Sequence, residues 1–190
     1  MPDKLSLQDL LEVQKHFELP SPALVEKDWY VVKALAAINA AEISPFQLVF
    51  SGGTALSRAH RLIRRMSEDI DLKIVSDQPC TRAEVRKLRD QITGALLGAG
   101  FEFDPENAEH RDSGNASRYT IYRLPYPPLV TGEGALRPEI PIETAVWPLR
   151  LPAVEQSVTS FGPKPSSSLP KCPRFPARRS SRLLPRSSSL

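Results

Sequence analysis

The sequence is poor in the residues that build disulfide frameworks and metal–thiolate sites. Its 190 residues include only two cysteines and three histidines, and Cys80 and Cys172 stand in no metal-type spacing with each other or with a histidine. This shortage excludes a disulfide-stabilised scaffold and a zinc module of the Cys/His type. The sequence also lacks an apolar run long enough to span a membrane, and its first residues do not resemble a secretory leader. We therefore expect a protein of the reducing cytoplasm.

Acidic residues are missing from one part of the chain. Residues 161–190 contain seven Lys and Arg, eight Ser and six Pro but no Asp or Glu, and their apolar residues follow no period. The preceding 160 residues hold 18 basic and 22 acidic groups, a net charge of −4, whereas the whole chain has +3. Such a tail buries too little apolar surface to offset the entropy lost on ordering. We expect a folded domain at residues 1–160 and a disordered tail at 161–190.

Apolar residues recur at two different spacings along residues 1–160. Helical spacing is found at residues 5–17, 22–41, 54–64 and from 81 to about Gly98–Gly100, and Thr81 with Glu84 forms a capping box at the start of the last segment. Runs typical of strands are found at residues 46–50, 69–75, 101–103, 117–124 and 137–146. This order predicts an α/β or α+β domain, with a short mixed β-sheet flanked by helices.

Two aspartates stand two residues apart on the strand predicted at 69–75. Asp69 and Asp71 therefore leave the same face of the strand, while Ile70 and Leu72 leave the other face, into the core. Mg²⁺ prefers oxygen ligands and often binds together with substrate phosphates. The pattern predicts a binding site for a complex of Mg²⁺ with a nucleotide.

A third acid, Glu143, also lies on one face of an alternating strand, the one predicted at 137–146. Glu143 shares one face of that strand with Pro141, and Ile142 lies on the other face. If the two acidic strands are neighbours, Glu143 completes an acidic trio that repels itself unless a cation neutralises it. Because proline donates no hydrogen bond to a ladder, Pro141 predicts an edge strand or an interrupted one.

A glycine pair lies between a predicted strand and a predicted helix. Gly52 and Gly53 lack a β-carbon, so the backbone can approach phosphates closely, and the helix that follows presents free N–H groups to an anion. The Thr54 hydroxyl and the Arg58 guanidinium are further donors to a triphosphate, and Arg65 is another candidate cation. The segment therefore predicts a phosphate-binding loop.

Each of these features alone has a simpler explanation. Alternating acids usually mark the solvated face of a strand, and a Gly-Gly pair usually marks a turn. Basic residues near a helix end favour the helix dipole without binding a ligand. The order of the features is what favours a site: strand, Gly-Gly-Thr, helix, Asp-x-Asp strand and a later acidic strand.

The same residues resemble a known family. The motif Ser51 to Arg58, followed by Arg65-Met-Ser-Glu-Asp-Ile-Asp-Leu72, is similar to the signature of the AbiEii/AbiGii nucleotidyltransferase toxins, which belong to the DNA polymerase β-like nucleotidyltransferase superfamily. Glu26-Lys-Asp-Trp-Tyr30 is similar to a stretch that opens an upstream helix in the family, and Ile140-Pro-Ile-Glu143 matches a later element. The resemblance covers roughly residues 20–160.

The resemblance implies an Mg²⁺-dependent nucleotidyltransferase, the toxin of a toxin–antitoxin or abortive-infection system, that transfers a nucleotide from an NTP to an RNA acceptor such as tRNA. It implies a transcription-regulating antitoxin as partner. The residues implied as metal ligands and catalytic acids are Asp69, Asp71 and Glu143, and those implied to bind the nucleotide are Gly52, Gly53, Thr54, Arg58, Arg65 and Ser67.

The resemblance ends before the chain does. Arg58 stands where the family usually has lysine, and the family's next helix, with a lysine and then an arginine, has no match. Residues 151–158 begin like a family helix, after which the basic tail starts near Gly162. One hypothesis is that the reading frame shifts near Gly162, and translating the coding DNA in its other two frames tests it. The alternative is a genuine disordered arm that contacts RNA phosphates.

Three functions therefore stand as hypotheses. The first is the nucleotidyltransferase. The second is a catalytically inactive, truncated remnant that binds only nucleotide or antitoxin. The third is a nucleic-acid-binding protein that acts through its basic tail.

Overall fold

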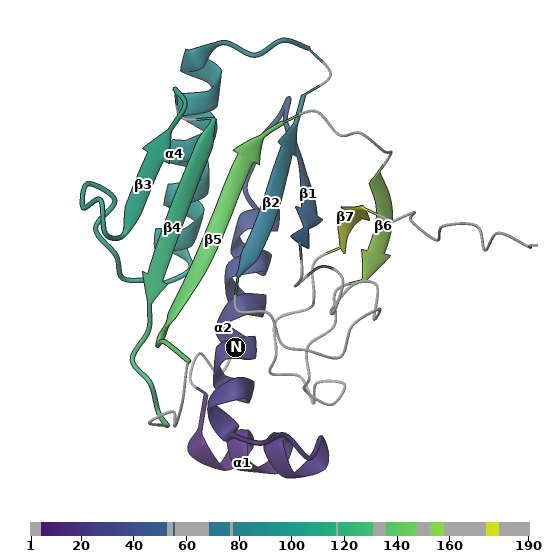
Figure 1. Ribbon diagram of the computed structural model, residues 1–190, viewed down its shortest axis with the longest axis vertical. Coiled ribbons are helices and arrows are strands. Elements are labelled where there is room, and N and C mark those ends of the chain that lie inside the picture. Colours follow the sequence, from purple (N-terminus) through teal and green to yellow (C-terminus); the bar gives the residue numbers. More distant parts are fainter. Residues whose placement is uncertain are drawn as a thin grey trace, which may run out of the picture.

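The computed structural model describes residues 5–52, 55, 69–76, 78–116, 118–130 and 136–147, and the backbone of residues 153–157 and 174–178. Within these residues, one sheet carries its strands in the order β3-β4-β5-β2-β1-β7-β6 (Figure 1). The helices are α1 (Leu7–His16), α2 (Pro22–Asn39) and α4 (Arg82–Gly98). The strands are β1 (Gln47–Ser51), β2 (Ile70–Val75), β3 (Arg111–Gly114), β4 (Tyr119–Pro125), β5 (Glu139–Val146), β6 (Ala153–Ser157) and β7 (Arg174–Arg178).

The sheet is mixed, as the sequence predicts. Strands β2 and β5 run parallel, whereas β1 with β2, β3 with β4, and β4 with β5 run antiparallel. The chain between β2 and β5 contains α4 and the β3–β4 hairpin, so the parallel pair is reached through a long crossover. Residues 71 and 143, far apart in sequence, are thereby brought to neighbouring strands at the centre of the sheet.

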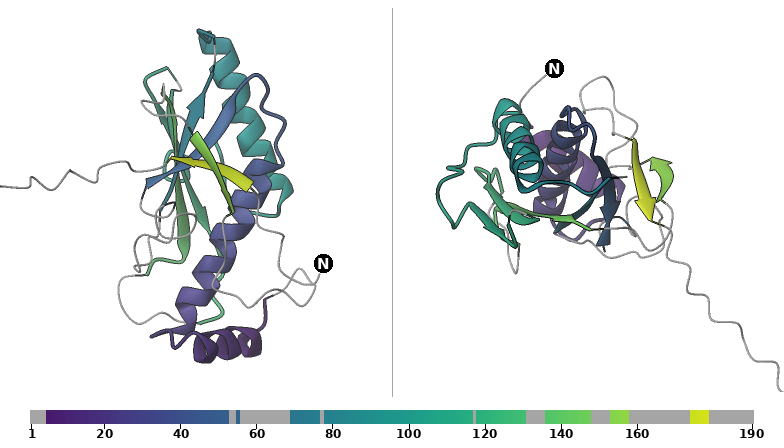
Figure 2. Two further views of the ribbon diagram at one scale, coloured as in Figure 1. Left: turned by 90° about the vertical axis from the view of Figure 1, so that its right-hand side faces the viewer. Right: turned by 90° about the horizontal axis from the view of Figure 1, so that it is seen from above.

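Helices α2 and α4 cover one face of this sheet (Figure 2). Alternate residues of β2, β4 and β5 are buried on that face, among them Leu72, Tyr122 and Ile142, each at most 1% exposed. Leu35 of α2 and Leu88 of α4 belong to the same apolar cluster. The intervening residues of the strands point to the opposite face, over which no helix of the described residues lies. We call this second face the open face.

Helix α4 ends at Gly98, within the range that the sequence predicts, and a glycine cap follows it. Gly100 has a positive φ of 79°, and the N–H groups of Gly100 and Phe101 donate to the carbonyls of Leu97 and Leu96. These two bonds form a Schellman motif, which uses the Phe101 N–H that a strand ladder would need. The prediction of a strand at residues 101–103 is therefore wrong, although Phe101 and Phe103 are buried.

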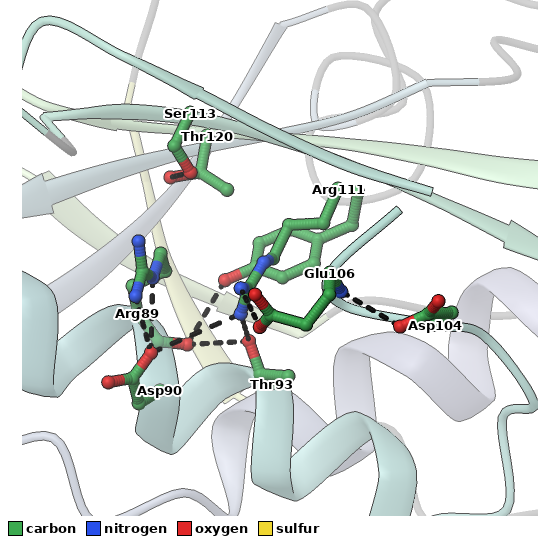
Figure 3. A network of polar contacts seen from close by, with 9 residues as sticks. Arg89, Asp90, Thr93, Asp104, Glu106, Arg111, Ser113 and Thr120 are labelled. Atoms are coloured by element: carbon green, nitrogen blue, oxygen red, sulfur yellow. Dashed lines mark hydrogen bonds and ion pairs between the residues drawn. The ribbon is translucent and has the colours of Figure 1, made fainter. Parts of the chain in front are cut away.

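A polar network holds the β3–β4 hairpin against α4 (Figure 3). Arg111 donates to the Thr93 hydroxyl at 3.2 Å and pairs with Glu106 at 3.2 Å. The Arg89 carbonyl accepts from the Thr93 hydroxyl at 2.8 Å and from the Tyr122 hydroxyl at 3.2 Å. Because the Tyr122 ring is fully buried, this bond satisfies a hydroxyl that would otherwise lack a partner in the core.

Two consecutive charges of α2 are buried against the β4–β5 connection. Glu26 and Lys27 are each 1% exposed. The Glu26 carboxylate accepts from the Leu129 N–H at 2.7 Å and from the Val130 N–H at 3.4 Å, and the Lys27 ammonium donates to the Arg137 carbonyl at 3.2 Å. Charge-assisted bonds of this kind are about twice as strong as neutral ones. Both residues therefore fix the chain that leads into β5.

Most of the helices and strands that the sequence predicts are present in the structure. Helices α1, α2 and α4, the Thr81–Glu84 capping box, and strands β1, β2, β4 and β5 confirm the predictions for those segments. Strand β3 was not predicted. The helical segment predicted at 54–64 lies outside the described residues, apart from Ala55. None of the helices in the described part of the chain is long and apolar enough to cross a membrane.

The two strands beyond β1, β7 and β6, differ from the sequence expectation. Residues 153–157 form β6, where the sequence resembles the start of a helix, and residues 174–178 form β7 inside the segment expected to be disordered. Strand β7 pairs with β1 and with β6. The free edge of β1 offers backbone partners, and a composition argument does not take such an edge into account. The other residues of 161–190 lie outside the described residues.

Pro141 lies on an inner strand, because β5 is flanked by β4 and β2. It pairs with Arg123 of β4, but the pairing of β5 with β2 begins one residue later, at Ile142. Strand β5 runs without a break from Glu139 to Val146, so the prediction of an edge or interrupted strand is wrong. The proline is tolerated on this inner strand because it lies where β2 has not yet begun.

Candidate active site

The centre of the candidate site is the pairing of strand β2 with its two neighbours. Asp71 is the register partner of Glu143 on β5 and of Ser51 on β1. Neighbouring strands lie about 4.8 Å apart, so the two acids leave adjacent backbone positions. Both are half-buried and alternate with the fully buried residues Ile70 and Ile142, which places them on the open face.

The turn after β1 packs directly against Asp71. Gly52 has a positive φ of 74°, and a β-carbon added to it would lie 2.9 Å from the Asp71 β-carbon and overlap the carboxylate. The Ser51 hydroxyl donates to the Asp71 carbonyl at 3.2 Å. Gly52 is therefore required both for its backbone conformation and for the space that the Asp71 side chain occupies.

Like charges surround the Asp71 carboxyl. Its pKa is raised first by burial, then by the neighbouring charges of Glu143 and Asp69, while Lys73 lowers it. Neighbouring acids of this kind oppose each other's ionisation, and a bound cation relieves the repulsion. The geometry and the direction of the shift together indicate a site suited to positive charge.

Tyr119 joins this group, and the sequence analysis missed it. The pKa of its hydroxyl is raised by burial and by the charges of Glu143 and Asp71, while Arg123 lowers it. The alternation of the strand predicted at 117–124 places Tyr119 on the polar face, but no motif marks it as part of a site. Only the β4–β5 register brings it to Glu143.

Of the remaining predicted site residues, only Asp69 lies within the described part of the chain. Asp69 lies one residue before β2 and is exposed. Gly53, Thr54, Arg58, Arg65 and Ser67 lie outside the described residues. In the described part of the chain, no three His, Cys, Asp or Glu side chains converge into a metal-binding group. The predicted acidic trio is therefore present as the pair Asp71–Glu143, with Asp69 as a nearby third charge.

The sequence matches a family of known proteins over most of its length. A family model described as the nucleotidyl transferase AbiEii toxin of type IV toxin–antitoxin systems matches residues 33–174. The chain belongs to the AbiEii toxin family. This match includes β1, β2, β5 and both acids, and it extends past residue 160, where the sequence predicts the end of the domain.

A solved structure shares the fold of this AbiEii family member. MenT4, a nucleotidyltransferase toxin from Mycobacterium tuberculosis H37Rv, is 22% identical, with a TM-score of 0.53. The alignment covers 93% of this chain and 56% of the MenT4 chain, so the chain spans little more than half the length of that toxin. No curated protein sequence gives a significant match.

The close packing of Gly52 against Asp71 gives a first prediction. Gly52→Ala should lower the free energy of unfolding by at least about 1 kcal/mol, because it places a β-carbon on a left-handed backbone and against the carboxylate. Gly94→Ala in α4 is the matched control, since a β-carbon there has open space and favours the helix by about 0.5–1 kcal/mol. Urea unfolding measures both. A Gly52→Ala protein as stable as wild type would contradict the described turn.

The crowding of acids gives a second prediction. Because the folded-state pKa of Asp71 is raised, the folded state binds this proton more tightly than the unfolded state, and stability is lost as the pH rises through that pKa. At pH 7 without divalent metal, Asp71→Asn should raise the melting temperature by on the order of 1–3 °C. The difference should vanish near about pH 3, where the aspartate is protonated in both states.

Asp112→Asn is the control for this measurement, because Asp112 is an exposed acid of β3. It should change the melting temperature little at either pH. If Asp71→Asn melts at or below the wild-type temperature at pH 7, the repulsion described for the acidic pair is not present.

Proposed function

We propose that this protein transfers a nucleoside monophosphate from an NTP to an RNA acceptor, with its active site on the open face around Asp71 and Glu143. The observation that carries the proposal is the register of the two acids on parallel strands, beside the Gly52 turn. Family membership supports the same reaction class, since the family is described as nucleotidyl transferase toxins.

The donor chemistry of the site suits Mg²⁺. Asp71 and Glu143 offer carboxylate oxygens, the ligands that this ion prefers, and their mutual repulsion favours a bound cation. We assign these two residues as ligands, with Asp69 as the third. Bound Mg²⁺ would neutralise phosphate charge and make the acceptor hydroxyl more acidic.

The turn after β1 would hold the triphosphate. The positive φ and missing side chain of Gly52 let the backbone come close to the acids and to any phosphate that lies over them. We assign Gly53 and Thr54 to the same loop, and Arg58, Arg65 and Ser67 as further phosphate donors. In the reaction, the acceptor oxygen forms a bond to the α-phosphorus, and the bond from that phosphorus to the pyrophosphate oxygen breaks.

The acceptor and the partner follow from the family resemblance. We propose tRNA as the acceptor and a transcription-regulating antitoxin as the partner that restrains the toxin. The basic residues of the tail would assist RNA binding through phosphate contacts, which is an electrostatic contribution that salt weakens.

The proposed function predicts label transfer that depends on the acidic pair. Protein incubated with Mg²⁺, total tRNA and each α-³²P-labelled NTP in turn should label RNA. Asp71→Asn and Glu143→Gln should each reduce the rate by about 100-fold or more, because metal-assisted charge stabilisation amounts to several kcal/mol. Asp112→Asn, an acid of the same sheet outside the site, should retain the wild-type rate.

Two results would contradict the proposal in different ways. Label transfer that persists in Asp71→Asn would mean that the acids are not the site. Nucleotide binding without label transfer from any NTP would favour the inactive remnant. RNA binding that is lost entirely when residues 179–190, which follow β7, are deleted, again with no transfer, would favour a binding protein that acts through its tail.

A further inference from the structure

A pocket of about 390 Å³ lies at the end of the sheet where β2 and β5 finish side by side (Figure 1). This volume falls within the range of about 300–1,000 Å³ that is typical of ligand sites. Ile74 of β2 and Val146 of β5 are buried and supply its apolar lining, while Arg118 and Trp147 line it as well. The pocket therefore combines apolar, aromatic and cationic groups.

Arg118 is held at the wall of this pocket by the loop before α4. Its guanidinium donates to the Cys80 carbonyl at 3.2 Å and lies 3.8 Å from the Cys80 sulfur. A guanidinium has about five N–H donors, so these two contacts leave others for a ligand. In the described part of the chain, no acid forms an ion pair with Arg118. An arginine that is held in place without a carboxylate partner is suited to bind a phosphate.

Trp147 supplies an aromatic surface in the same pocket. Its backbone N–H donates to the Ile74 carbonyl at 3.1 Å, which fixes its position beside the end of β2. The residue is nevertheless 59% exposed, so much of its surface is free to bury a ligand. Proteins bind single-stranded nucleic acid by stacking bases on such aromatic side chains while basic residues contact the phosphates. Trp147 and Arg118 together offer both kinds of contact.

We propose that this pocket binds a nucleotide of the acceptor RNA, with its base on Trp147 and its phosphate on Arg118. The inference rests on the proposed function, because a nucleotidyltransferase must hold the strand that it modifies. Ile74 lies three residues after Asp71 on β2, about 10 Å along the strand. The pocket and the acidic pair would therefore bind different parts of one RNA strand, the pocket holding a nucleotide away from the reacting end.

The fluorescence of Trp147 provides a local test. The chain has two tryptophans, Trp29 and Trp147, so Trp29→Phe leaves Trp147 as the single indole. The full-length Trp29→Phe protein would be titrated with a single-stranded RNA pentamer and, separately, with ATP. The pentamer should quench the fluorescence of Trp147, because a base stacked on an indole quenches it, whereas ATP should quench it much less.

The affinity for a labelled RNA pentamer, measured by fluorescence anisotropy, tests each side chain in the otherwise wild-type protein. Arg118→Gln and Trp147→Ala should each weaken binding by about 10-fold. Both variants should melt near the wild-type temperature, because Trp147 is exposed and glutamine keeps an amide donor for the Cys80 carbonyl. Arg86→Ala is the control, since it removes an exposed arginine of α4 outside the pocket, and its Kd should stay within about twofold of wild type.

The outcomes separate the inference from the proposed function. If the pentamer leaves Trp147 unquenched, or if Arg118→Gln binds it as tightly as wild type, the inference is wrong, while label transfer would still support the proposed function. Equal quenching by ATP would assign the pocket to the NTP and overturn the inference. An equal loss of affinity in Arg86→Ala and Arg118→Gln would indicate nonspecific charge attraction and overturn it too. Quenching and affinity that depend on Arg118, without label transfer, would support the RNA site and contradict only the proposed reaction.

Discussion

The rest of the structure depends on the parallel pairing of β2 with β5. This ladder holds Asp71 and Glu143 at adjacent positions, although their charges repel. Burial of the apolar residues that alternate with the acids offsets this repulsion. Ile70 and Ile142, for example, are fully buried in the core that α2 and α4 cover. A site that concentrates negative charge is thus maintained by a core on the other side of the same strands.

The elements around this pair restrict its geometry from three directions. On the β1 side, Gly52 leaves room that the Asp71 carboxylate fills. On the β4 side, Ile121 is the register partner of Glu143, and Tyr119 is its diagonal neighbour. At the start of β5, Glu26 and Lys27 of α2 fix the preceding connection through bonds to its backbone. A mutation in any of these supports can therefore act on the acids without touching a substrate.

The sequence predicts much of this arrangement because its signals are local. Period-two alternation in residues 69–75 and 137–146 identifies both strands and the face of each acid, and the Thr81–Glu84 pair identifies the start of α4. The rest depends on tertiary contacts. The segment from Phe101 to Phe103 has the aromatic composition of a strand, but Phe101 completes a helix cap. Strand β7 pairs along the edge of β1, and the place of Tyr119 near Glu143 follows from register alone. Local patterns carry no information about such partners.

The central claim is that Asp71 and Glu143 bind one divalent cation together with the triphosphate. A crystal structure of the protein with Mn²⁺ and a non-hydrolysable NTP analogue tests it most directly, because the anomalous signal locates the metal. The account predicts a peak bonded to carboxylate oxygens of both residues and to phosphate oxygens, with the triphosphate beside Gly52. A triphosphate bound elsewhere, with no metal between the two acids, would contradict it.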